Sequence, residues 1–179
     1  INIGCVPSLG LSLVPRVIQK YHSIHPDNEL TIDTLHGPEI VSSILNCELD
    51  LGIVLGAYER QGLTACHIAD IPLVVIDPKC SKGPVALEDI DPERYIGLSK
   101  NDPTACLLDM AWEQAGKASA AVVRVRTHYM AAALVRQGGG CTIVDGLTAL
   151  HYPNLSAPLA LRPALKIPCT VLFRADYVV

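Results

Sequence analysis

The chain has 179 residues, 50% of them hydrophobic and 18% charged, with a formal net charge of −4. This length suffices for one ordinary domain or two small lobes with a core, and the apolar content excludes intrinsic disorder. No apolar run approaches the roughly 18 residues of a membrane-spanning helix, so we expect a soluble protein. The 14 lysines and arginines are scattered and outnumbered by acidic residues, which argues against nucleic-acid binding by this chain alone.

The first third of the chain alternates between strand and helix patterns. Residues 1–6 predict a strand and residues 7–10 a turn, and a helix follows with apolar side chains at helical spacing from Leu13 to Tyr21. Residues 29–34 alternate as a strand does, residues 40–45 predict a second helix, and residues 49–54 predict a third strand. This β-α-β-α-β order predicts a parallel sheet with right-handed crossovers.

The rest of the chain repeats that order. An apolar strand over 71–76 and a proline-rich loop over 78–92 lead to a strand over 95–98 and a turn over 99–103. A helix to Gly116, a strand over 120–125, a helix over 127–136 and strands over 141–145 and 167–173 follow. Two such units predict two lobes with a cleft between them, where the carboxyl ends of parallel strands bind ligands.

The seven cysteines are widely spaced and include no C-x-x-C pair. Zinc sites and disulfide frameworks favour closely spaced pairs. We therefore expect buried, reduced thiols in a cytoplasmic protein. Because the chain opens on Ile1, we also expect it to be a piece of a longer protein.

Polar residues follow the first strand of each predicted unit. Ser8 lies between strand and helix in the first unit, and Ser99 holds the matching place in the second, with Asn101 and Asp102 close behind. Each serine alone is more typical of a helix cap. Two polar turns facing one cleft strengthen the alternative, in which hydroxyls and helix amides bind a carboxylate, beyond what either turn indicates alone.

Two further turns carry polar groups toward the predicted cleft. Thr127 precedes His128 at the start of a helix and is interpreted as a cap that also faces the cleft. Asp145 ends an apolar strand, and the pattern leaves two interpretations open. Its carboxylate either caps the short helical turn over 147–150 or pairs with a cationic group of a ligand.

No set of residues indicates catalysis, a metal or a cofactor, so we expect no enzyme. Residues 138–140 are three glycines that follow a helix and open a strand, which is the reverse of the order in phosphate-binding loops. They are interpreted as a helix end and turn. Cys141 and His128 lack the exposed turn that a nucleophile and its base need.

An ordered set of short motifs resembles the effector-binding domain of LysR-type transcriptional regulators. The motifs are INIG at 1–4, PSL at 7–9, LVP at 13–15, HP at 25–26, ELDLGI at 48–53 and LVRQGGG at 134–140. The stretch TIVDGLTAL at 142–150, with LRP at 161–163 and IP at 167–168, resembles the branch that senses opines and basic amino acids. Gly146 and Leu147 stand where that branch usually has proline and phenylalanine, and Ala105 where arginine is common.

The resemblance implies a fold like that of type 2 periplasmic binding proteins, an α/β architecture of two Rossmann-like lobes. Lobe I would comprise residues 1–72 plus 173–179 and lobe II residues 73–172, with crossover strands near 73–76 and 170–173. The whole protein would carry an N-terminal winged helix-turn-helix that binds DNA. It would assemble as a dimer within a tetramer, without membrane contact.

The same resemblance implies a set of effector-binding residues. Ser8 and Ser99 would hold an effector carboxylate from opposite sides of the cleft, and Asp145 would hold an amino or guanidino group, so the effector would be amino-acid-like. The rest of the site would be lined by Leu9, His36, Asn101, Thr127 and His128.

Two other functions compete with this interpretation. A redox sensor would use Cys106, which lies near the position of the reactive cysteine in peroxide-sensing members of the family, but no resolving cysteine follows within about three helical turns. A periplasmic solute-binding protein is disfavoured by seven cysteines, because an odd number suits an oxidising compartment poorly.

Overall fold

The computed structural model describes residues 1–80, 82–118, 121–152 and 157–176. The chain forms two compact units, Ile1–Asp70 with Pro168–Val179 and Ile71–Ile167. Lobe I therefore ends at residue 70 rather than the predicted 72 and resumes at 168 rather than 173. The second difference arises because Cys169 to Phe173 pair with a strand of unit 1. Residues 177–179 of the predicted tail lie outside the described residues.

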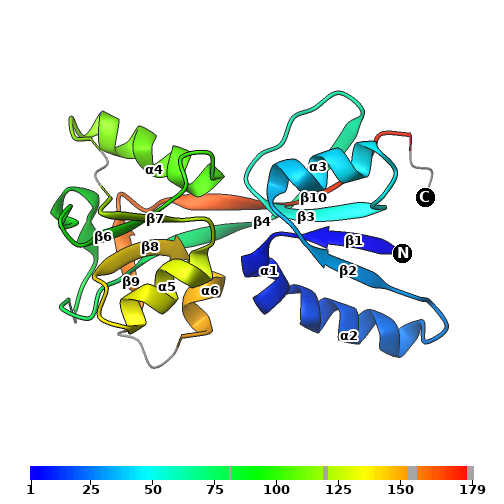
Figure 1. Cartoon of the computed structure of the whole chain (residues 1–179), viewed down its shortest axis with the longest axis horizontal. Coiled ribbons are helices and arrows are strands. Elements are labelled where there is room, and N and C mark those ends of the chain that lie inside the picture. Colours follow the sequence, from blue (N-terminus) through cyan, green and yellow to red (C-terminus); the bar gives the residue numbers. More distant parts are fainter. Residues whose placement is uncertain (81, 119–120, 153–156, 177–179) are drawn as a thin grey trace. The chain divides into compact units, whose positions relative to one another are not determined.

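Unit 1 is built on a mostly parallel sheet in the order β2-β1-β3-β10. Strands β1 (Asn2–Cys5), β2 (Thr31–Thr34) and β3 (Leu51–Leu55) are parallel, and β10 (Lys166–Arg174) is antiparallel to β3. Helix α3 (Gly37–Leu45) lies on one face, and α1 (Pro7–Ser12) and α2 (Val14–Ile24) lie on the other (Figure 1). The hydrophobic core on the α3 side of the unit 1 sheet contains Ile40, Val41, Ile44, Leu49, Val54 and Leu172.

The segment expected as a turn at residues 7–10 is helical. Pro7 occupies the first turn of α1, where its missing N–H costs no hydrogen bond. Pro15 lacks the N–H that would continue the helical hydrogen bonding. The helix is therefore interrupted at Leu13, before α2 begins. The prediction of a turn was therefore wrong, and Ser8 lies inside α1 rather than before it.

Unit 2 repeats the architecture with strands in the order β4-β8-β6-β7. Strands β6 (Tyr95–Leu98), β7 (Val123–Val125) and β8 (Cys141–Asp145) are parallel, and β4 (Leu63–Ile76) is antiparallel to β8. Strand β9 (Leu159–Arg162) pairs with β4 and with β5 (Val85–Ala86), which leads into a short 3-10 turn at Leu87–Asp89. Ala120, in the predicted strand over 120–125, lies outside the described residues.

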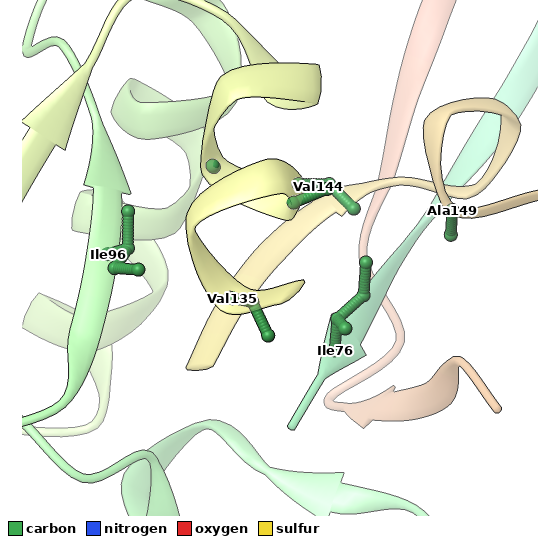
Figure 2. Packing of buried hydrophobic residues seen from close by; sticks show 7 residues of the cluster. Ile76, Ile96, Val135, Val144 and Ala149 are labelled. Carbon is green, nitrogen blue, oxygen red and sulfur yellow. The ribbon is translucent and has the colours of Figure 1, made fainter. Parts of the chain in front are cut away.

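Helices cover both faces of the unit 2 sheet. Helix α4 (Pro103–Gln114) lies on one face, and α5 (His128–Arg136) and α6 (Gly146–Leu150) lie on the other (Figure 1). Figure 2 shows Ile76, Ile96, Val135, Val144 and Ala149 as part of the cluster that joins α5 and α6 to the sheet. Within the described ranges, no helix has the length and apolar content needed to cross a membrane.

Candidate functional site

The carboxyl ends of parallel strands carry most of the predicted site residues in both units. In unit 1, α1 and α3 follow β1 and β2 and bring Ser8 and His36 to that edge. In unit 2, α4, α5 and α6 follow β6, β7 and β8 and bring Ser99, Thr127 and Asp145 to one edge of the sheet. This placement arises because every parallel strand leaves the sheet on the same side.

Ser8 and Leu9 are both buried in α1. Ser8 is 4% exposed, and within the described part of the chain its hydroxyl makes no hydrogen bond. A buried hydroxyl without a partner is uncommon and marks a place where an external acceptor or donor fits. Leu9 is fully buried, and its backbone N–H donates to the carbonyl of Val6, so it contributes to packing in this structure.

His36 caps the start of α3. Its backbone N–H donates to a carboxylate oxygen of Glu39 at 2.8 Å, one half of a capping box. Tyr58 lies against the same helix start, because a Cβ atom on Gly37 would overlap the Tyr58 hydroxyl. Sequence reasoning missed Tyr58, which follows the third parallel strand and carried no recognisable motif.

Ser99 fixes the turn between β6 and α4. Its backbone N–H and hydroxyl both donate to the carbonyl of Val125, at 2.8 and 3.2 Å, which ties this turn to the end of β7. Asn101 is exposed. Asp102 caps α4 by accepting the backbone N–H of Thr104 at 2.8 Å. Lys100 and Asn101 are therefore the exposed residues of this turn whose side chains make no hydrogen bond among the described contacts.

Thr127 and His128 begin α5. The Thr127 hydroxyl oxygen accepts the backbone N–H of Met130 at 3.3 Å, as the predicted cap requires. His128 is 6% exposed. Its Nε2 atom lies 3.2 Å from the hydroxyl of Thr104 and 3.9 Å from a carboxylate oxygen of Asp102, which places it against the start of α4.

Asp145 is fully buried, and its side chain is engaged within unit 2. One carboxylate oxygen accepts the backbone N–H of Thr148 at 2.8 Å and the other accepts the Thr148 hydroxyl at 2.6 Å. The second oxygen also lies 3.0 Å from Nδ1 of His128. Of the two interpretations left open by the sequence, the structure shows the cap of α6, together with an internal histidine partner.

The Asp145–His128 contact favours the charged form of both groups. Burial works against the imidazolium, but the hydrogen bond and charge of Asp145, helped by Asp102, raise the pKa of His128 above its ordinary value. Burial likewise disfavours the carboxylate, but His128 and the hydrogen bonds of Thr148 lower the pKa of Asp145. The two side chains therefore form a buried ion pair whenever His128 is protonated, at the carboxyl edge of the unit 2 sheet.

Sequence reasoning named His128 and Asp145 but missed that they contact each other. It also missed Thr104 and Thr148, the hydroxyls on either side of the pair. The available signal was topological: His128 follows β7, Asp145 ends β8, and both strands are parallel to β6. The contact itself depends on helix starts that the sequence pattern does not fix to within a residue.

The cysteines divide into buried and accessible groups. Cys5, Cys141 and Cys169 are buried, as expected, but Cys47, Cys66 and Cys106 are exposed and Cys80 is partly exposed. The prediction of buried thiols was therefore wrong for Cys47, Cys66 and Cys106 and only partly right for Cys80. Over the described ranges, no three histidine, cysteine or acidic side chains group as metal ligands.

Comparison with known proteins identifies the family. The chain matches the model of the LysR substrate binding domain over residues 1–177. It belongs to that family. The match confirms the resemblance found in the sequence.

Named relatives and solved structures agree with this assignment. The chain is 30% identical over 176 residues to the HTH-type transcriptional regulator AdmX of Serratia plymuthica, covering 98% of this chain and 56% of that protein. The Synechocystis PCC6803 CcmR regulatory domain in complex with 2-PG has a TM-score of 0.86 at 17% identity, covering 100% and 89% of the two chains. The sulfate-bound regulatory domain of OxyR2 E204G from Vibrio vulnificus has a TM-score of 0.81 at 16% identity, covering 99% and 87%.

These comparisons confirm the predicted type 2 periplasmic-binding-protein-like fold and the expectation that this LysR domain is not an enzyme. The chain spans about half the length of the curated relatives it matches.

Proposed function

We propose that this LysR substrate-binding domain senses a small carboxylate and thereby controls DNA binding by a longer transcriptional regulator. The observation that carries the proposal is the gathering of polar helix starts at the carboxyl edge of each sheet. Ser8 of unit 1 offers a buried hydroxyl that makes no hydrogen bond to the described residues, and Asn101 of unit 2 offers an exposed polar residue. Solved domains of the same fold carry 2-PG and sulfate, which supports a small ligand for this chain.

The proposed effector set keeps the predicted residues Ser8, Leu9, His36, Ser99, Asn101, Thr127, His128 and Asp145. Within it, an amino-acid-like effector requires Asp145 to accept a ligand ammonium. Both Asp145 oxygens are already occupied by Thr148 and His128, so an ammonium has to displace one of these partners. The effector carboxylate is therefore the primary part of the proposal. Thermal unfolding with matched ligands decides whether the effector also carries an amino group.

The partners of the whole protein belong to the same proposal. We propose a cytoplasmic homodimer or homotetramer that contacts DNA through a winged helix-turn-helix outside this chain. We also propose that it contacts no membrane. Support comes from the named relative, which is an HTH-type regulator and of which this chain covers 56%. Size-exclusion chromatography with light scattering measures the oligomeric state of this domain directly.

Thermal unfolding against matched ligand pairs tests the effector proposal. Each amino acid or opine is compared with the acid that lacks its amino group, and aromatic acids and dicarboxylates complete the panel. A ligand at 100 times its Kd stabilises the folded state by about 2.7 kcal/mol. The shift should disappear in Ser8→Ala and Ser99→Ala and persist in Ser23→Ala, a matched change on the exposed face of α2.

The outcomes separate the possible ligands. Equal stabilisation by both members of a pair supports a carboxylate effector and removes the ammonium role of Asp145. Stabilisation by the amino compound alone, lost in Asp145→Asn, supports the amino-acid-like effector. A panel without any stabilising carboxylate would contradict the proposal.

The redox alternative through Cys106 rests on the exposure of that side chain in α4. Its thiol donates to the carbonyl of Lys100 at 3.3 Å, at the same polar turn as Ser99. Cys141, at the start of β8, is buried. Stabilisation by peroxide that is lost in Cys106→Ser would favour this alternative over the carboxylate. The periplasmic alternative would require a signal peptide in place of a helix-turn-helix in the intact gene.

A further inference from the structure

A cavity separate from the proposed effector residues lies in unit 2, at the end of α4. Its volume is about 260 Å³, and its lining residues all lie between Glu88 and Ala118. Among them, Tyr95 begins β6 and Trp112 stands in the last turn of α4. The proposed effector residues of unit 2 follow the carboxyl ends of the strands, whereas Tyr95 lies at the amino end of β6. The cavity is therefore at the opposite edge of the sheet from those residues.

Two buried aromatic side chains line this cavity. The rings of Tyr95 and Trp112 meet edge to face, with 5.2 Å between their centroids, and the two residues are only 3% and 5% exposed. Ile90 and Pro92 add further apolar surface. The indole N–H of Trp112 donates to the backbone carbonyl of Leu87 at 3.1 Å, so the polar atom of this ring is already paired. The lining therefore offers a flat apolar molecule an aromatic surface to pack against.

The Tyr95 hydroxyl is a buried polar group that makes no hydrogen bond among the described residues. Burial raises the pKa of Tyr95 above its ordinary value, although the charge of Arg124 opposes the shift, so the hydroxyl is neutral at physiological pH. A neutral phenolic hydroxyl both donates and accepts, and a buried one without a partner is uncommon. Because Tyr95 lines the cavity, the polar atom of a bound molecule is a fitting partner for it.

The charged side chains of the cavity balance one another. Glu88 and Lys117 are the charged residues of the lining, and both are exposed. The Lys117 ammonium donates to the backbone carbonyl of Glu88 at 2.8 Å. With one charge of each sign and a neutral hydroxyl, the lining supplies no net charge to compensate an ion for its lost hydration. An uncharged ligand avoids that cost.

We propose that this cavity is a second ligand site, for a small uncharged aromatic compound that carries one hydrogen-bonding group. The ring of the compound packs against Tyr95 and Trp112, and its polar group pairs with the Tyr95 hydroxyl. An apolar cavity of about 150 Å³ is enough for benzene, so about 260 Å³ accommodates one ring with a substituent. The site does not depend on the proposed carboxylate effector, whose residues lie at the other edge of the sheet.

Phenol and toluene test the proposal, because they have nearly the same shape and only phenol carries a hydrogen-bonding group. Trp112 is the one tryptophan of the chain, so its indole N–H resonance in an NMR titration reports on the cavity unambiguously. Both compounds should shift this resonance, and phenol should bind at least about tenfold more tightly than toluene. In Tyr95→Phe that preference should disappear, while toluene binds as it does to wild type. Tyr129→Phe, at an exposed position of α5, should keep the preference.

Thermal unfolding of the free domain gives an independent readout. Because Tyr95→Phe removes a hydroxyl that makes no hydrogen bond among the described residues, this variant should unfold at the wild-type temperature or above it. A lower unfolding temperature would show that the hydroxyl is paired in the free domain and would overturn the proposal. An indole resonance that neither compound moves, or a preference for phenol that survives in Tyr95→Phe, would overturn it as well. Failure of the carboxylate panel changes none of these results, so the two proposals fail separately.

Discussion

Asp145 and His128 lie against each other inside unit 2, with 3.0 Å between the carboxylate oxygen and Nδ1 and almost no exposed surface on either side chain. The same carboxylate caps α6 through Thr148. One side chain therefore joins the end of β8, the start of α5 and the start of α6. A contact of this kind makes the residue important for stability as well as for the proposed effector site.

Asp145→Ala should destabilise the domain by about 3–5 kcal/mol, because it leaves a buried histidine charge without its partner and removes a helix cap. Asp145→Asn keeps a capping oxygen and should cost less. Urea denaturation monitored by circular dichroism measures both. The exposed pair of His67 and Asp70, at 2.9 Å, provides the control: Asp70→Asn should cost less than about 1 kcal/mol. A loss in Asp145→Ala no larger than in Asp70→Asn would contradict the buried-pair interpretation.

The stability contributed by the pair should have a pH maximum. Because the folded pKa of His128 is raised, its contribution is complete below the unfolded value of about 6.5 and is lost as the pH rises through the folded pKa. Because the folded pKa of Asp145 is lowered, its contribution is complete above about 3.9 and is lost as the pH falls through the folded pKa.

Unfolding free energies of wild type and His128→Gln across the pH range test this expectation. The difference in unfolding free energy between wild type and His128→Gln should be greatest between about pH 3.9 and pH 6.5 and should shrink at alkaline pH. His67→Gln, an exposed histidine beside a carboxylate, should follow the wild-type profile closely. A wild-type advantage over His128→Gln that grows above about pH 8 would mean that the neutral ring is the stabilising form.

Most helices and strands could be predicted from the spacing of apolar residues in the sequence. The elements that the sequence analysis missed were missed for physical reasons. The β-α-β-α-β order was visible because apolar side chains recur at helix and strand spacing on buried faces. The first half of β4 was missed because residues 63–70 are largely exposed and carry no apolar alternation. Strand β9 was missed because so short a segment cannot be distinguished from a loop by its sequence when its partner strand is not known.

The candidate site was predictable in position but not in connectivity. Parallel strands bring Thr127 and Asp145 to one edge whatever the detailed packing, so the sequence located them. Whether Asp145 faces a ligand or a neighbouring histidine depends on the side-chain direction at the start of α5. That direction is set by tertiary packing of α5 against β6 and β8, which local patterns do not encode.

The glycines between α5 and β8 offer a matched pair of substitutions. Gly140 has φ +126°, and a Cβ atom there would lie 2.0 Å from the backbone oxygen of Arg94. Gly138 has φ +85°, but a Cβ atom there would meet nothing within 4 Å, so alanine at this position adds only backbone strain of about 1–2 kcal/mol. Gly140→Ala should therefore destabilise unit 2 clearly more than Gly138→Ala in urea denaturation. Equal losses would show that the chain at Arg94 moves aside without cost.

Thiol accessibility provides a last prediction, which bears on the redox alternative. Burial raises the pKa of Cys141 to about 11 and also raises that of Cys5, so both thiols are protonated and shielded at neutral pH. Cys47, Cys66 and Cys106 are exposed. Brief treatment of the native domain with iodoacetamide, followed by peptide mass spectrometry, should label the three exposed thiols and leave Cys5 and Cys141 unmodified until urea is added.

The same labelling after peroxide treatment separates a sensor from an accessible surface thiol. A disulfide switch between Cys106 and Cys141 requires the buried thiol to become accessible, because thiol exchange proceeds through an exposed thiolate. With Cys141 buried in β8, peroxide should oxidise Cys106 without forming that disulfide, and Cys106→Ser should leave carboxylate binding unchanged. Detection of a Cys106–Cys141 crosslink in the folded domain would favour redox sensing over carboxylate sensing as the function of this domain.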